Sequence, residues 1–192
     1  MEREILFTGI GGQGVQLAAK SLAYAAMKEG RRVLMFGTYG GMMRGGDTDA
    51  TVVIGDESLI TPPVVDSFWA AFAMHHLSWP QVGPKLRPAG FMLRNEGVFL
   101  GETGHSGAVL ALAATRMASE AGMPQAGSMV ALGGFAAATG IVRLETLLDV
   151  AEEVLPSYRR QFAEANRTAL RLGHAAVDGI LCAAWAPVEQ AA

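Results

Sequence analysis

The sequence predicts an α/β fold, a Rossmann-like, mostly parallel sheet flanked by helices with a helical C-terminal part. Three observations carry this prediction. A short apolar run at residues 4–8 leads into a glycine-rich turn and an amphipathic helical stretch. A second apolar run at residues 32–36 completes a strand–helix–strand unit, which needs a right-handed crossover and parallel strands. Apolar residues at helical spacing then dominate from residue 107 onward.

The remaining elements follow in order. The first helix ends at Gly30, and Arg32 to Phe36 is expected to be a buried strand. Residues 37–49 contain five glycines and predict a long loop that leads into a β-branched run at residues 51–54. Further strands are expected at residues 67–74 and 90–94. Helices are expected at residues 107–121, 128–138, 143–154 and 159–181, the last with Phe162, Ala169, Leu172, Ala176 and Ile180 on one stripe.

The bulk properties favour a single domain, residues 1–192, because 51% of the 192 residues are hydrophobic and only 17% are charged. A net charge of -3 gives no electrostatic support for a nucleic-acid partner. Glycine, proline or charge interrupts every apolar run before it reaches membrane-spanning length, and the first residues do not resemble a signal peptide, so we expect a cytoplasmic protein. High apolar content without a membrane segment favours burial against other subunits.

The turn of Gly9, Gly11 and Gly14 fits the G-x-G-x-x-G pattern between a strand and a helix. Glycines there permit a tight turn and close approach of a ligand, and free helix N–H groups favour an anion. The alternative is that these glycines only let the first helix pack closely on the sheet. Gln13 in the first helical turn is expected either to hydrogen-bond a ligand or partner backbone, or to face solvent as a cap.

A dinucleotide site needs an acidic residue at the end of the second strand, but Phe36 is followed by Gly37 and Thr38, which disfavours NAD. Ligands of doubly wound sheets bind at the carboxyl ends of strands, so the loop after the second strand is expected beside the glycine turn. Arg44, between glycines, can present its guanidinium to a phosphate or carboxylate; the alternative is a solvated arginine on a surface loop.

Other polar residues are weaker candidates. His75 and His76 have no carboxylate or cysteine at ligand spacing, so structural or surface roles are favoured over a metal site. Cys182 is the only cysteine, which excludes an internal disulfide and a self-contained iron–sulfur cluster, and it is expected to be a buried small hydrophobe. No nucleophile, general base or metal site emerges, so we expect other chains to supply the chemistry.

Two segments together resemble the gamma subunit, or gamma domain, of the pyruvate/2-oxoacid:ferredoxin oxidoreductase family. They are residues 9–15, and Tyr39-Gly40 followed by Arg44-Gly45-Gly46 and residues 50–54. Later landmarks at residues 62–65, 86–90, 129–133 and 166–173 extend the similarity over nearly the whole chain. The sequence departs from the family pattern at Gly41-Met42-Met43, where many members carry Gly-Pro-Glu, and at Ser128, where asparagine is frequent.

The resemblance implies a subunit of a complex that oxidatively decarboxylates a 2-oxoacid, usually to an acyl-CoA. It implies thiamine diphosphate, Mg²⁺, [4Fe-4S] clusters and coenzyme A in the complex, none held by this chain alone, and alpha, beta and ferredoxin-like delta-type partner subunits. The contact with cofactor or partner is expected at Gly9, Gly11, Gly12, Gln13, Gly14, Thr38, Tyr39, Gly40, Arg44, Gly45 and Gly46. The alternatives are a free-standing Rossmann-like module that binds FAD or CoA, and an independent NAD-dependent dehydrogenase.

Overall fold

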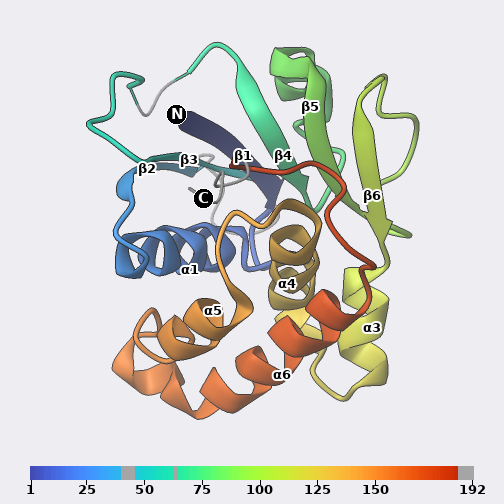
Figure 1. Ribbon diagram of the computed structural model, residues 1–192. Coiled ribbons are helices and arrows are strands. Elements are labelled where there is room, and N and C mark those ends of the chain that lie inside the picture. Colours follow the sequence, from blue (N-terminus) through green and yellow to red (C-terminus); the bar gives the residue numbers. More distant parts are fainter. Residues whose placement is uncertain (40–45, 63–64, 186–192) are drawn as a thin grey trace.

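The structure, a computed structural model, describes residues 1–39, 46–62 and 65–185. These residues form a six-stranded sheet in the order β2-β3-β1-β4-β5-β6 (Figure 1). Parallel pairing joins β1 to β4, β4 to β5 and β5 to β6, whereas β3 runs antiparallel to both β1 and β2. The strands are β1 (Glu2–Ile10), β2 (Arg32–Tyr39), β3 (Asp47–Gly55), β4 (Phe68–Ala73), β5 (Leu86–Asn95) and β6 (Ala108–Leu112). The predicted mostly parallel α/β architecture is confirmed.

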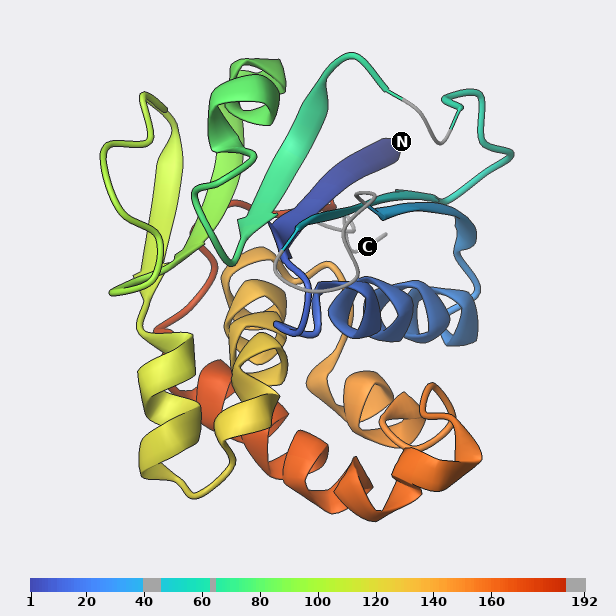
Figure 2. The same ribbon diagram turned by 180° about the vertical axis from the view of Figure 1, so that it is seen from behind.

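The larger helices gather on one face of the sheet, as both ribbon views show (Figures 1 and 2). The helices are α1 (Val15–Lys28), α2 (Trp79–Val82), α3 (Ala114–Glu120), α4 (Gly127–Thr139), α5 (Leu144–Val150) and α6 (Ala163–Ala175), with 3-10 turns η1 (Gly83–Lys85), η2 (Pro124–Ala126) and η3 (Ser157–Phe162). We call this the helical face. The opposite face, here the open face, is covered mainly by Trp79, Phe99 and neighbouring loop residues. Each face therefore has its own hydrophobic cluster.

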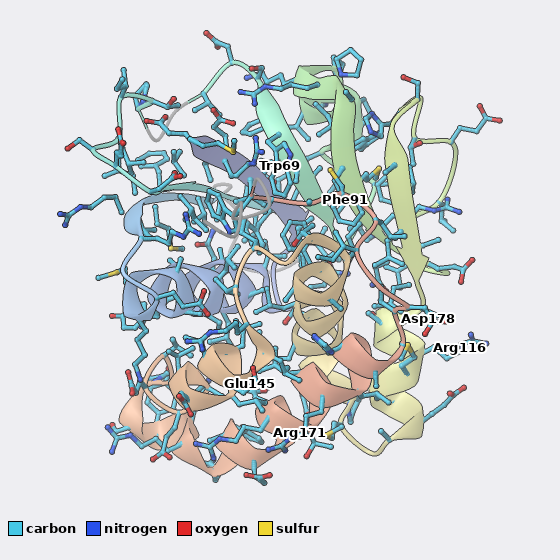
Figure 3. All side chains as sticks on the ribbon, viewed as in Figure 1. Trp69, Phe91, Arg116, Glu145, Arg171 and Asp178 are labelled. Atoms are coloured by element: carbon cyan, nitrogen blue, oxygen red, sulfur yellow. The ribbon has the colours of Figure 1, made fainter. Side chains whose placement is uncertain are left out.

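Four phenylalanines form the centre of the core on the helical face. Phe7 of β1 lies 4.8 Å from Phe72 of β4, ring centre to ring centre, and Phe135 of α4 lies 6.0 Å from Phe72 and 5.6 Å from Phe91 of β5. Figure 3 shows Phe91 on its strand beside the helical layer. Tilted and edge-on ring pairs at these distances stabilise the core beyond the area that they bury. The cluster fixes α4 across the middle of the sheet.

Small residues allow α4 and α6 to cross at very short distance. A Cβ atom added at Gly133 would collide with the Leu170 carbonyl, and one added at Gly173 would collide with the Val130 carbonyl. Helix α4 is buried along almost its whole length, in agreement with the helix expected at residues 128–138. Backbone contact between the two helices therefore depends on glycine at both positions.

The second strand was expected to be buried, and this is wrong. Strand β3 lies between β1 and β2 and runs antiparallel to both. Strand β2 is therefore parallel to β1, as the crossover predicts, but it lies at the edge of the sheet. Leu34, Met35 and Phe36 are 40%, 37% and 47% exposed. Apolar content alone does not separate a buried strand from an exposed apolar edge.

Three of the expected helices were too long, among them the one expected at residues 143–154, which ends at Val150. Residues 108–112 form β6, the edge strand beside β5, and only residues 114–120 form a helix. Alanine and leucine favour helix locally, but pairing with β5 decides the outcome. The last helix ends at Ala175, and Phe162, Ala176 and Ile180 are exposed rather than part of a stripe.

The chain after α6 returns to the end of α4 instead of continuing as a helix. The amides of Leu181 and Cys182 donate to the Ala138 carbonyl, and the amide of Ala184 donates to Thr139. These bonds satisfy carbonyls that the end of a helix leaves without partners. Within the described residues, no helix is both long and apolar enough to cross a membrane.

Candidate functional site

The glycine-rich turn connects the end of β1 to the start of α1. Gly12 and Gly14 have φ angles of 101° and 76°, a left-handed conformation that glycine adopts without strain. Gly14 is the N-cap of α1, where no side chain caps the helix and the first turn has no acidic residue. The start of α1 therefore combines free N–H groups and the positive end of the helix dipole with no anionic side chain of its own first turn, which suits a phosphate or carboxylate.

The loop after β2 was predicted to lie beside this turn, and Gly46 of that loop does so. The Gly11 amide donates a 2.9 Å hydrogen bond to the carbonyl of Gly46. Asp47, the first residue of β3, pairs with Ile10, the last residue of β1, so the antiparallel β3 holds Gly46 against the turn. Gly46, the last residue of the Arg44-Gly45-Gly46 segment, therefore lies beside the glycine-rich turn.

The other predicted site residues divide into two groups. Thr38 and Tyr39 end β2, where their backbones pair with Asp49 and Thr48. Gly40, Arg44 and Gly45 lie outside the described residues.

The side chain of Gln13 forms hydrogen bonds with two backbone groups of the same chain. Its Oε1 accepts from the Ile10 amide at 3.0 Å, and its Nε2 donates to the Met74 carbonyl at 3.3 Å. A Cβ at Gly9 would lie 2.7 Å from the same Oε1. Gln13 therefore fastens the turn to the end of β4, which was not among the two roles expected for it.

Ser128, near the start of α4, contacts the glycine turn. A Cβ at Gly14 would meet the Ser128 Oγ at 2.5 Å, and Ser128 is 1% exposed. The beginnings of α1 and α4 are therefore in direct contact. This contact explains why a small side chain follows Gly127 here.

Asn95 joins the ends of β4 and β5 at the same edge of the sheet. Its side chain is buried, and its Nδ2 donates to the Met74 carbonyl at 3.4 Å and to the Thr115 Oγ1 at 2.8 Å. The Thr115 amide donates in return to Asn95 Oδ1. The Met74 carbonyl therefore accepts hydrogen bonds from both Gln13 and Asn95. These bonds connect the turn after β1 and the end of β5 to the end of β4.

His75 and His76 lie at this edge, although sequence reasoning favoured structural or surface roles for them. They follow Met74, whose amide donates to the Thr8 carbonyl at 2.8 Å. Their rings stack 4.3 Å apart, and His76 also meets Phe99 edge-on. Their position directly after an expected strand was the signal that could have placed them at the site.

Backbone hydrogen bonds assign the protonation of both imidazoles. The Leu77 amide donates to His75 Nδ1 at 3.1 Å, and the Leu100 amide donates to His76 Nδ1 at 3.3 Å. Each ring is therefore assigned as neutral, with its proton on Nε2. Burial, followed by the neighbouring His76, lowers the pKa of His75, and Asp47 opposes the shift. The pair offers Nε2–H donors rather than positive charge.

Residues that commonly bind metals do not cluster in the described part of the chain, where no group of three histidine, cysteine, aspartate or glutamate side chains could hold an ion. Cys182 is half-buried, and burial raises the pKa of its thiol. A raised pKa disfavours the thiolate that nucleophiles and metal ligands require.

Three comparisons place this geometry among known proteins. The family described as pyruvate ferredoxin/flavodoxin oxidoreductase matches residues 4–176. The 2-oxoglutarate synthase subunit KorC of Methanothermobacter marburgensis is 31% identical over 81% of this chain and 88% of its own.

Two solved structures have the same fold. The gamma subunit of a keto/oxoacid ferredoxin oxidoreductase from Geobacter sulfurreducens aligns over 90% of this chain and 96% of its own, with a TM-score of 0.76 and 26% identity. The 2-oxoglutarate:ferredoxin oxidoreductase of Magnetococcus marinus, solved with 2-oxoglutarate, coenzyme A and succinyl-CoA bound, aligns over 93% of this chain and 32% of its own, with a TM-score of 0.77 and 20% identity. The last likeness shows the fold alone.

The family match covers most of the sequence, and the related subunits align over most of their length. The chain therefore belongs to the pyruvate ferredoxin/flavodoxin oxidoreductase family as a chain of the gamma-subunit type.

Proposed function

We propose that this chain is the non-redox subunit of a 2-oxoacid:acceptor oxidoreductase that decarboxylates its substrate oxidatively to an acyl-CoA. The relatives named above are subunits of 2-oxoacid enzymes, which supports this reaction class. With one cysteine, the chain lacks the thiolates that commonly hold an iron–sulfur cluster. Thiamine diphosphate, Mg²⁺ and the [4Fe-4S] clusters are assigned to alpha, beta and delta-type partners, in a cytoplasmic complex.

The contact between Gly11 and Gly46 is the observation that carries the proposed site. Around it, the start of α1 has no side-chain cap, and the space where a Gly12 side chain would lie is open. These features fit a phosphate-bearing group such as that of coenzyme A, which provides the thiol that accepts the acyl group. This chain's part is to bind and orient that group with the backbone amides of Gly12 and Gly14 and with Arg44, since the amides of Gly11 and Gln13 already donate to Gly46 and Ile10.

The exposed edge of the sheet supports a role in assembly. Among the residues that the structure describes, strand β2 pairs only with β3, and it exposes Leu34, Met35 and Phe36. Natural edge strands usually carry charges, prolines or bulges that prevent further pairing, and large exposed apolar areas mark interaction sites. We assign this edge to contact with the thiamine-binding subunits.

A free-standing nucleotide-binding module is disfavoured because the chain matches gamma-type subunits over most of its length. An NAD-dependent dehydrogenase is disfavoured because β2 ends in Gly37-Thr38-Tyr39, without the acidic residue that binds the ribose hydroxyl.

Kinetics of the complete complex test the proposed site. We expect Arg44→Ala to raise the KM for coenzyme A or to weaken assembly, because the guanidinium is assigned to the anionic group. Arg116→Ala is the matched control, since Arg116 is exposed on α3 (Figure 3). Normal kinetics of an intact Arg44→Ala complex would remove Arg44 from the site.

A further inference from the structure

Two consecutive histidines follow the end of β4 with their rings stacked. Neighbouring side chains of an extended strand point to opposite faces of the sheet, but the chain bends after Ala73. The bend brings the rings of His75 and His76 to 4.3 Å, centre to centre, with 23° between their planes. Both residues are only half-buried, so the two rings form one polar group at the surface of the protein.

Backbone amides occupy one nitrogen of each ring and leave the other nitrogen free. His75 Nδ1 accepts from the Leu77 amide and His76 Nδ1 accepts from the Leu100 amide, so each neutral ring carries its proton on Nε2. Within the described ranges, no group accepts a hydrogen bond from either Nε2, and neither Nε2 is among the buried polar atoms that lack a partner. Both Nε2–H groups are therefore donors that a ligand can reach from solvent.

This bonding pattern disfavours a metal ion and a positive charge at the pair. A histidine that ligates a metal through one ring nitrogen usually donates N–H from the other, whereas here the other nitrogen accepts. Protonation of His75 Nδ1 would set its N–H against the Leu77 amide N–H. Burial, followed by His76, also lowers the pKa of His75. The pair is therefore suited to donate two neutral hydrogen bonds to oxygen atoms.

The pair lies beside the glycine-rich turn. Met74, the residue before it, donates its amide to the Thr8 carbonyl of β1 and accepts at its own carbonyl from Gln13 Nε2. Strands β1 and β4 are parallel neighbours, so the turn and His75 follow them at the same edge of the sheet. The space beside Gly12 is open, since no atom lies within 4 Å of a Cβ added there. The two imidazole donors thus adjoin the free amides at the start of α1.

Apolar side chains flank the two donors. Leu77 and Leu100, whose amides hold the rings, are 47% and 62% exposed. Asp47 is the charged residue that acts on His75, but its effect on the pKa ranks below burial and below His76. Its exposure to water screens its repulsion of an anion. Neutral donors beside exposed leucines fit a ligand that joins an oxygen-rich group to a less polar arm.

We propose that His75 and His76 form a second binding element of the cofactor-proximal site, where their Nε2–H groups donate to the oxygen atoms of a diphosphate. Two donors on separate rings suit a group with many oxygen atoms, and Leu77 and Leu100 contact the arm that the diphosphate carries. The inference rests on the proposed function, which places a phosphate-bearing group at the glycine-rich turn. The histidines bind the ligand and perform no chemical step.

Nitrogen-15 NMR of the full, unmodified chain tests the donors without any substitution. Both rings should show a protonated Nε2 and an unprotonated Nδ1. Inorganic pyrophosphate should shift the Nε2 resonances of His75 and His76, whereas His174 of α6 should not respond. Sodium chloride at the same ionic strength should leave all three histidines unchanged. A proton on Nδ1 of either ring, or no shift with pyrophosphate, would overturn the inference.

Binding of desulfo-coenzyme A to the complete complex tests the site in its working form, because this analogue lacks the thiol and cannot accept an acyl group. The double variant His75→Phe/His76→Phe keeps two stackable rings but removes both donors, so calorimetry should show binding weakened about tenfold or more. His75→Gln/His76→Gln keeps an N–H donor at each position and should fall between. His174→Phe is the control and should bind as the unmodified complex does.

Equal affinity of the double phenylalanine complex and the His174→Phe complex would exclude the pair from the site. That result is obtained with an assembled complex, so it leaves the proposed function standing. Failure of the chain to co-purify with partner subunits would instead overturn the proposed function, while the pyrophosphate shifts of the isolated chain would still report on the histidines.

Discussion

The amide of Gly11 donates to the carbonyl of Gly46 over 2.9 Å, which joins two motifs separated by more than thirty positions. The bond exists because β3 turns back antiparallel along β1 and pairs Asp47 with Ile10. Two glycine-rich segments thereby meet at the uncapped start of α1. This junction is the structural basis of the proposed composite site.

Replacement of Gly14 by alanine tests the fit between the turn and α4. An alanine at φ 76° costs about 1–2 kcal/mol, and its Cβ would also meet Ser128 Oγ at 2.5 Å. Gly122→Ala is the matched control, with a φ of 74° and no atom near the added Cβ. In urea unfolding, we expect Gly14→Ala to lose more stability than Gly122→Ala.

The double variant Gly14→Ala/Ser128→Ala separates the two costs. Removal of the Ser128 Oγ should recover the part of the unfolding free energy that the collision costs. The part lost to backbone strain at position 14 should remain. Equal losses in Gly14→Ala and Gly122→Ala would show that Ser128 does not press on the turn.

Gln13→Ala should loosen the turn from the end of β4. The change removes the acceptor of the Ile10 amide and a donor to Met74, at a cost of about 1–3 kcal/mol. Hydrogen exchange of the Ile10 amide, followed by NMR, should become faster. Gln125→Ala, at an exposed position, is the control, and unchanged protection of Ile10 in Gln13→Ala would contradict the role given to the side chain.

The pH dependence of stability should report the burial of Asp49. Burial raises the pKa of this carboxyl above its ordinary value of 3.8, so the folded chain binds more protons than the unfolded chain from about that pH up to the raised pKa. Its contribution to stability is therefore present in acid and is lost as the pH rises through this window. Asp49→Asn should gain stability over the unmodified chain at about pH 7 relative to about pH 3, in urea titrations. A difference independent of pH would argue against the shift.

Phe36→Lys should block assembly without unfolding the chain. Phe36 is 47% exposed on the edge strand, so the substitution should change the free energy of unfolding by no more than about 0.5 kcal/mol, whereas a lysine opposes pairing along an edge. Pull-down of the partner subunits should fall. Ile180→Lys, at a residue 60% exposed outside the sheet, should not reduce it, and equal recovery with both variants would exclude β2 as the docking edge.

The sequence predicted the strand–turn–helix unit well because glycine and helical periodicity are local signals. It placed the loop after the second strand beside the glycine-rich turn, because both follow the carboxyl ends of strands in a doubly wound sheet. In the structure, β3 separates β1 from β2 and delivers Gly46 instead. Strand β6 was missed because a five-residue alanine- and leucine-rich run has no period that distinguishes it from a helix.

The partners of polar side chains could not be predicted in the same way. Gln13, His76 and Arg94 owe their positions to residues more than twenty positions away in the sequence. Only the strand order brings Thr8, Asp49 and Arg94 into one row. Registers between distant strands are tertiary information, which a single sequence does not contain in its local patterns.

Isolation of the chain from its native cells under mild conditions, followed by mass spectrometry of the co-purifying proteins, tests directly whether the chain is a subunit of a 2-oxoacid oxidoreductase complex. We expect a complex in which this 20.1 kDa chain accompanies, in fixed stoichiometry, larger chains that contain thiamine diphosphate and cysteine-rich cluster motifs. Recovery of the chain alone, as a 20.1 kDa species with no such partners, would contradict it.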